Sequence, residues 1–135
     1  MLRHILFAIN LIRAVPAYCA VCLSGAKKLI CAETEGYMCE VGLTLAEIRG
    51  LYRNVKAYSK TKRVPVSMAN FPAKGYLVQE PYGVTLVMSP WNYPFMLAME
   101  PLAGAIAAGN CCVVKPSAYA PATSAVLAAI VKECF

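Results

Sequence analysis

The chain has 135 residues, which is enough for one domain of modest size. Hydrophobic residues make up 59% of it and charged residues 15%, aspartate is absent, and the mean hydropathy is +0.55. A free-standing domain of this length buries too little of its surface for so apolar a composition. We therefore expect much of the chain to face other protein or a membrane. Other protein is favoured for the last hundred residues, and a membrane stays open for the start of the chain.

The net charge of +6 is concentrated at the start of the chain. Residues 1–32 contribute +4 and contain no acidic residue, whereas the rest of the chain contributes only +2. Six bases between Arg49 and Arg63 have Tyr52 and Tyr58 among them, a pattern that some nucleic-acid-binding surfaces share. A solvated helix face is the commoner meaning, and we expect no nucleic-acid partner.

The seven cysteines form neither a disulfide framework nor a metal-binding pattern. Cys19 and Cys22 match a C-x-x-C motif, but no second pair follows and His4 is the only histidine. Adjacent residues of a strand point to opposite faces, so Cys111 and Cys112 cannot easily act together on an outside group. We expect reduced thiols in a reducing compartment, hence a cytoplasmic protein without a metal site.

The first 26 residues leave three alternatives open. Arg3 and His4 precede the apolar run Ile5–Ile12, and small residues follow, as in a secretory signal or membrane anchor. Arg13 and Pro16 argue against a helix that spans a membrane. The favoured alternatives are a helix packed on the body and a segment that is not the native start of the gene product, with membrane contact through residues 1–26 as the third.

The next segment, Glu33–Lys60, is typical of amphipathic helices. Apolar side chains recur in it at steps of three and four residues. Thr44 follows Gly42 and precedes Glu47 by three residues, so a capping box is predicted to start a helix at this point. Residues 60–65 break the pattern, residues 70–81 are predicted to form an extended strand, and residues 80–83 a turn.

The remaining sequence predicts a strand–helix–strand unit followed by another helix. The apolar run Val84–Met88 suits a strand buried on both faces, Pro94–Ala108 an apolar helix that Gly109–Asn110 ends, and Cys111–Val114 a second strand. Such a unit has parallel strands and a right-handed crossover. Ligands in parallel sheets bind beyond the carboxyl ends of the strands, where the turns 89–93 and 115–119 fall.

The fold class predicted from these segments is α/β. It comprises N-terminal helices, an extended strand, and an incomplete Rossmann-like βαβα unit, because Ala122–Phe135 adds a last helix to only two core strands. We divide the chain into a hydrophobic basic leader (1–32), a helical region (33–68) and a partial cofactor domain (69–135).

Three motifs resemble the N-terminal part of aldehyde dehydrogenases, most closely the dimeric and fatty-aldehyde class. They are Ser89-Pro-Trp-Asn-Tyr-Pro-Phe95, Gly104-Ala-Ile-Ala-Ala-Gly-Asn110 and Val114-Lys-Pro-Ser117, in this order. The resemblance covers residues 33–135 and leaves out residues 1–32. It implies NAD or NADP as the cofactor, an aldehyde as the substrate, and a homodimer whose interface includes residues 70–79.

The same resemblance implies the site residues. Asn92 would stabilise the oxyanion that forms when a cysteine attacks the aldehyde, although an Asn before such a helix is often only a cap. Ser89, Pro90 and Trp91 would shape the cofactor pocket. Lys115 would bind the adenosine ribose, and Ser117 in the same turn would help to seat the cofactor. Ala118 stands where the family commonly has a ribose-binding glutamate, which leaves NADP open.

The sequence lacks three further parts of the family's site. It has no Gly-Gln-x-Cys nucleophile motif, no Glu-Leu-Gly-Gly base motif and no glycine-rich pyrophosphate loop. We therefore expect a fragment of an NAD(P)-dependent aldehyde dehydrogenase that is inactive alone. The alternatives are a non-catalytic, truncated interaction protein and a small membrane-associated protein.

Overall fold

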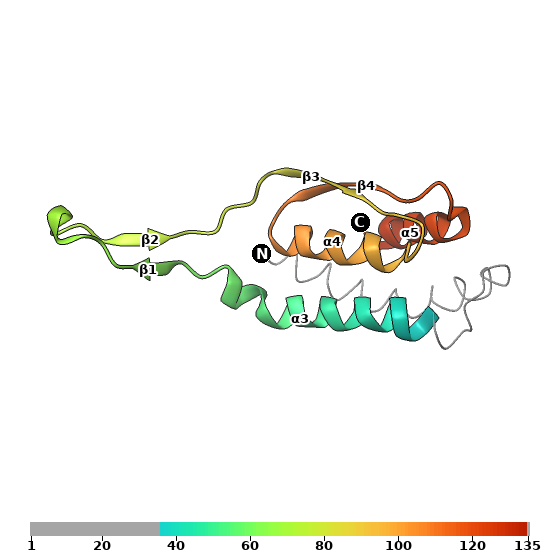
Figure 1. Cartoon of the computed structure of the whole chain (residues 1–135), viewed down its shortest axis with the longest axis horizontal. Coiled ribbons are helices and arrows are strands. Elements are labelled where there is room, and N and C mark those ends of the chain that lie inside the picture. Colours follow the sequence, from blue (N-terminus) through green and yellow to red (C-terminus); the bar gives the residue numbers. More distant parts are fainter. Residues whose placement is uncertain (1–35, 135) are drawn as a thin grey trace.

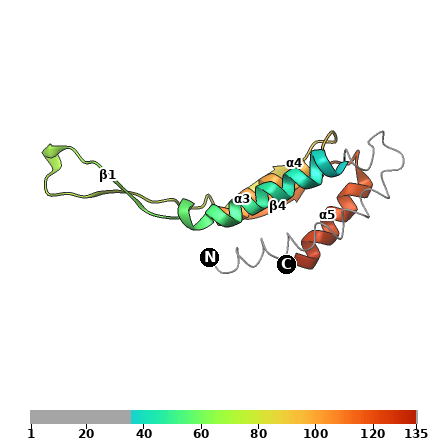
Figure 2. The ribbon, with the colours of Figure 1, turned by 90° about the horizontal axis from the view of Figure 1, so that it is seen from below.

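The computed structural model describes residues 36–134, and the predictions for the leader therefore lie outside the described residues. The elements in chain order are η1 (Tyr37–Val41), α3 (Gly42–Tyr58), β1 (Lys62–Val64), η2 (Met68–Asn70), β2 (Gly75–Leu77), β3 (Val84–Met88), α4 (Met96–Ala107), β4 (Cys111–Lys115) and α5 (Pro121–Cys134). Figure 1 shows a layered body, with α3, then α4, then the sheet of β3 and β4, and a long arm that leaves the body. Figure 2 shows α5 to one side of these layers.

In the part of the chain that the structure describes, the first helical segment begins before the predicted capping box. A π-helical turn, η1, runs directly into α3, and the backbone at Gly42 stays helical. Thr44 is fully buried inside this helix, and its Oγ1 donates a hydrogen bond to the carbonyl of Glu40 at 2.8 Å. The predicted cap at Thr44 was therefore wrong: the hydroxyl bonds back to the preceding turn, which lets a threonine sit inside a helix.

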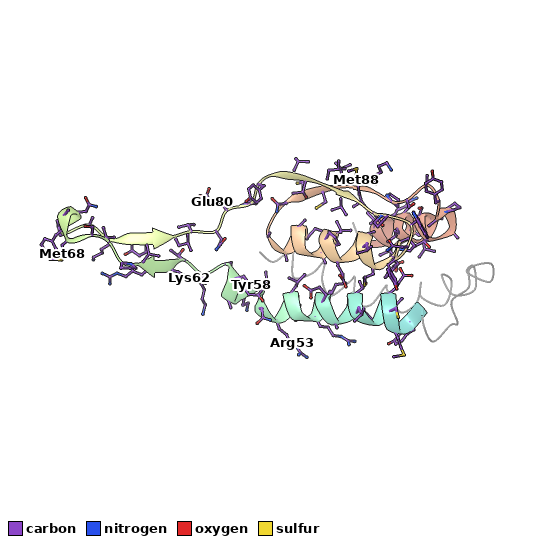
Figure 3. The ribbon with its side chains drawn as sticks, viewed as in Figure 1. Arg53, Tyr58, Lys62, Met68, Glu80 and Met88 are labelled. Carbon is purple, nitrogen blue, oxygen red and sulfur yellow. The ribbon has the colours of Figure 1, made fainter. Side chains whose placement is uncertain are left out.

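The arm, residues 60–82, corrects the strand predicted over residues 70–81. Only Gly75–Leu77 is a strand, and its antiparallel partner is Lys62–Val64, in the segment predicted only as a break. The two strands approach closely at Gly75, where an added Cβ would lie 2.9 Å from Cγ2 of Val64 in β1. The arm projects into solvent with Met68 at its tip (Figure 3), and most of its large apolar side chains are exposed.

The predicted strand–helix–strand unit is confirmed. Strands β3 and β4 pair in parallel, from Val84 opposite Cys111 to Met88 opposite Lys115, with α4 between them in sequence. Gly109 ends α4 with a φ of +89°, the left-handed conformation expected there. Asn110, 8% exposed, then accepts a hydrogen bond from the Gly83 amide at its Oδ1 (3.0 Å), which holds the starts of both strands together.

The prediction that β3 is buried on both faces was wrong for the described residues. Alternate side chains of β3 and β4 point toward α4, and Val87 among them is buried. Side chains of the other face are largely exposed, including Leu86 (60%), Met88 (66%) and Val113 (55%). Met88, labelled in Figure 3, lies on this exposed face. An apolar run predicts a buried strand but does not say what covers each face.

One core joins α3, α4 and α5 to the covered face of the sheet. Its buried members are Val41, Leu45, Ile48, Phe95, Ala98, Met99, Leu102, Ala103, Ile106, Val126, Leu127 and Ile130. Half-buried Cys112 and Val114 of β4 pack against them. Among residues 36–134, no helix is both long and apolar enough to cross a membrane.

Candidate active-site edge

Two turns meet where the parallel strands end, and we call this pair of turns, Ser89–Tyr93 and Lys115–Tyr119, the carboxyl edge. The amide of Ser89 donates a hydrogen bond to the carbonyl of Lys115 at 3.1 Å, directly after the last paired residues, Met88 and Lys115. The structure therefore brings the turn that carries Asn92 next to the turn that carries Lys115, as the topology predicted.

The first turn is closed from within by Ser89. This residue is 8% exposed, and its hydroxyl lies 3.0 Å from the carbonyl oxygen of Pro94 and 3.2 Å from that of Pro90, so it can donate to either. The closed turn leaves Pro90, Asn92 and Trp91 on the outside, with Trp91 66% exposed. Ser89 is thus a structural brace, and the exposed residues of the turn are the ones that can meet a ligand.

The start of α4 is capped from a distant part of the chain. Phe95 precedes the helix and no side chain nearby caps it. Instead, Oε2 of Glu40 in η1 accepts hydrogen bonds from the amides of Phe95 (2.9 Å) and Met96 (3.3 Å). A carboxylate at this position satisfies two otherwise unpaired N–H groups and complements the positive end of the helix dipole. No local sequence pattern predicts this role of Glu40, because Glu40 and Phe95 are 55 positions apart in the chain.

The cap has a consequence for Asn92. An Asn before a helix commonly serves as its cap, but here Glu40 occupies that role. Within residues 36–134 the side-chain amide of Asn92 makes no hydrogen bond, and the residue is exposed. Its N–H donors are therefore free for a ligand at the carboxyl edge.

In the second turn, one of the two predicted site residues is exposed and the other is buried. Lys115 is exposed, and its ammonium group has no partner within the described part of the chain. Ser117 is 6% exposed, and its Oγ accepts a hydrogen bond from the amide of Tyr119 at 3.3 Å. The Ser117 carbonyl also accepts a hydrogen bond from the hydroxyl of Ser124, at 3.0 Å, so Ser117 fastens the turn to α5.

The carboxyl edge has a chemistry that fits a dinucleotide. It offers the Lys115 cation for ribose or phosphate oxygens and the exposed rings of Trp91 and Tyr119 (84% exposed) for flat apolar surfaces. Ala118 adds no carboxylate that would repel a 2′-phosphate. The donors present thus fit NAD or NADP at the level of chemistry.

Within residues 36–134, one carboxyl group and one thiol group have clearly perturbed pKa values, and neither belongs to the two turns of the carboxyl edge. Burial, and secondly the charge of Glu47, raise the pKa of Glu100 above its ordinary value. Burial, followed by the charge of Glu133, raises the pKa of the Cys134 thiol. A groove of about 380 Å³ lies at the other end of α4, beside Ala107 and Ala108, and none of the predicted site residues lines it.

Comparisons with known proteins identify the family. The profile of the aldehyde dehydrogenase family matches residues 27–135. The 4,4'-diaponeurosporen-aldehyde dehydrogenase of Staphylococcus aureus is 43% identical over 103 residues, which are 76% of this chain and 22% of that enzyme. An aldehyde dehydrogenase of Craterostigma plantagineum is 44% identical over 101 residues, 75% of this chain and 21% of that protein. The chain thus matches about a fifth of the length of these curated relatives.

Solved structures agree with this result. A substrate-bound AldH of Staphylococcus aureus superposes with a TM-score of 0.92 at 36% identity, over 98% of this chain and 29% of that one. A succinic semialdehyde dehydrogenase of Streptococcus pyogenes in complex with NADP+ shares the fold, with a TM-score of 0.75 at 20% identity, over 98% of this chain and 27% of that one. On the family profile, the curated relatives and the fold together, this chain belongs to the aldehyde dehydrogenase family.

Proposed function

We propose that the chain contributes part of the active site of an NAD(P)-dependent aldehyde dehydrogenase that oxidises aldehydes to carboxylic acids. In this reaction a cysteine thiolate of the complete enzyme would add to the aldehyde carbon, the nicotinamide cofactor would supply the hydride acceptor, and water would hydrolyse the resulting thioester. The chain has no cysteine in the sequence motif of that nucleophile. Its proposed contribution is therefore to bind and orient the aldehyde and the cofactor.

Asn92 would stabilise the oxyanion formed by thiolate attack. The observation that carries this proposal is the unpaired, exposed amide of Asn92 on a turn braced by Ser89. A fixed N–H donor that faces developing negative charge lowers the barrier because it needs no reorganisation during the reaction. A mobile or already bonded amide would not serve in this way.

The cofactor would lie along the carboxyl edge. Lys115 would donate to its adenosine ribose, Pro90 and Trp91 would line the nicotinamide side, and Ser89 and Ser117 would keep the two turns in shape. This assignment is supported by the exposure of Lys115 and Trp91 and by the hydrogen bond that joins the two turns. The bound nicotinamide would supply the hydride acceptor.

The whole enzyme would be a cytoplasmic homodimer. The dimer is supported by the arm: within residues 36–134 its two strands pair only with each other, and the arm exposes side chains such as Phe71 (80%) and Tyr76 (58%). Unpaired strand edges of this kind can accept a strand from another subunit. The reducing compartment is supported by Cys39, Cys111, Cys112 and Cys134, whose thiols form no disulfide within residues 36–134.

The test is Asn92→Ala in the complete gene product. Reduction of NAD and NADP during aldehyde oxidation is followed by the absorbance of the reduced nicotinamide at about 340 nm. We expect kcat to fall about 100- to 1000-fold, as for the loss of other oxyanion donors. Asn54→Ala is the matched control, because Asn54 is exposed and bonds only to the carbonyl of Gly50. Wild-type turnover in Asn92→Ala would refute the role of Asn92.

A second experiment tests the chain by itself. The 135 residues contain neither the nucleophile motif nor the base motif, so we expect them to reduce no NAD(P) with any aldehyde. Quenching of the fluorescence of Trp91, the sole tryptophan, would report cofactor binding. Turnover by the 135 residues alone would contradict the proposal that they bind and orient but do not supply the nucleophile.

A further inference from the structure

We propose that Glu40 is a positioning residue for the oxyanion donor, and that it acts on the reaction through Asn92. This inference rests on the proposed function of the carboxyl edge. Its basis is one contact: Oε2 of Glu40 accepts hydrogen bonds from both Phe95 and Met96, the two residues at the start of α4. The Glu40 carboxylate thus binds the backbone only three residues after Asn92, although Glu40 itself lies near the start of the described residues.

The turn that carries Asn92 is held at two ends. At its start, Ser89 bonds through its amide to Lys115 of the neighbouring strand. At its end, the chain must enter α4 at a fixed angle, and the residue before the helix, Phe95, has no capping side chain of its own. Glu40 supplies the missing acceptor, so the direction in which the chain leaves the turn depends on where η1 lies.

Glu40 is itself held in place by burial around it. The next residue, Val41, is 5% exposed, and Thr44, one turn further on, is fully buried and bonds to the Glu40 carbonyl. Phe95, whose amide donates one of the two hydrogen bonds to Glu40, is also 5% exposed. Both partners of the contact therefore sit on packed elements, which allows one hydrogen-bonded carboxylate to fix a turn that is otherwise at the surface.

Loss of this carboxylate would leave two amides at the helix start without an acceptor, and the first turn of α4 could then fray. Asn92 would lose its fixed position, although its side chain would remain. Displacement of a catalytic group by about 1 Å is enough to reduce rates by about 100-fold. A glutamine at position 40 keeps a carbonyl oxygen of the same reach, so it should preserve the geometry and lose only the charge.

The experiment is a double-mutant cycle in the complete gene product. We expect Glu40→Ala to lower kcat about 10- to 100-fold with little change in the KM for NAD(P), and Glu40→Gln to restore most of the loss. In an Asn92→Ala background, Glu40→Ala should have almost no further effect on kcat, because its action passes through Asn92. Glu47→Ala is the control, since Glu47 is exposed on the same helical segment and caps nothing.

Each outcome decides between the two proposals. If Asn92→Ala lowers kcat and Glu40→Ala lowers it by the same factor in both backgrounds, Glu40 has only a structural role and this inference is wrong. If Asn92→Ala leaves kcat unchanged, the proposed function itself fails. The anisotropy decay of Trp91, measured in the 135-residue chain where it is the sole tryptophan, gives an independent reading. Glu40→Ala should increase the local motion of the indole, and an unchanged decay would contradict the inference.

Discussion

Replacement of Asn110 by alanine tests whether one buried amide holds the parallel strands in register. Asn110 accepts a hydrogen bond from the Gly83 amide at 3.0 Å, and its Nδ2 donates to the carbonyl of Ala105 at 3.3 Å. The Ala105 carbonyl keeps another donor in the variant, because the backbone amide of Asn110 also bonds to it at 2.9 Å. Only the Gly83 amide loses its sole partner.

The size of the effect follows from this arrangement. One lost hydrogen bond contributes about 1 kcal/mol, and a partly buried amide left without an acceptor adds up to about 1 kcal/mol. Gly83 is exposed, so water can reach its amide and the second contribution stays small. We therefore expect Asn110→Ala to lower the free energy of unfolding by about 1–2 kcal/mol.

The assay is urea unfolding followed by the circular dichroism of the helices, together with hydrogen exchange at the Gly83 amide. The control, Asn54→Ala, removes an exposed bond to Gly50 and gains helix propensity, so its stability should change by less than about 0.5 kcal/mol. Equal stability of the two variants, or an unchanged exchange rate at Gly83, would refute the role of Asn110 as the link between the strands.

Three further predictions concern stability. In thermal unfolding, Gly109→Ala should lower the free energy of unfolding by about 1 kcal/mol, since φ is +89° at this position. Gly50→Ala, inside α3 with nothing near the new Cβ, should raise it by about 0.5–1 kcal/mol. Ile48→Ala should cost about 2–5 kcal/mol in urea, because Ile48 is 1% exposed in the core. Because the pKa of Glu100 is raised in the folded state, its ionisation destabilises the fold as the pH rises above 4.5. Glu100→Gln should therefore raise Tm at pH 7 but not at pH 4. An equal shift in Tm at both pH values would contradict this reasoning.

Local patterns in the sequence predicted the centre of the fold well. The strand Val84–Met88 was predicted with the same bounds as observed, and Gly109 was predicted as the left-handed end of α4. Both features depend on neighbours in sequence: a run of β-branched residues, and the one residue type that adopts a positive φ without strain. The parallel pairing followed from the crossover helix, because strands joined in this way have few other arrangements.

Features that depend on distant partners could not be predicted in this way. Thr44 matched a capping box in sequence, yet packing buried it inside a longer helix. Strand β1 was predicted only as a break, because three residues gain strand structure only from their partner β2. The bare face of β3 has the same origin, since an apolar sequence does not state which surfaces are covered.

The arrangement of the carboxyl edge depends both on local sequence patterns and on contacts between distant residues. The motif around Asn92 fixes a turn of known composition, but two contacts outside the motif decide where that turn lies: the bond from Ser89 to Lys115 and the cap that Glu40 places on α4. The sequence separations of these contacts are long, so each depends on the complete packing of α3, α4 and the sheet. It follows that core substitutions such as Ile48→Ala, far from any ligand, should impair oxyanion stabilisation in proportion to how far they displace η1 from the start of α4, and not merely in proportion to the stability they remove.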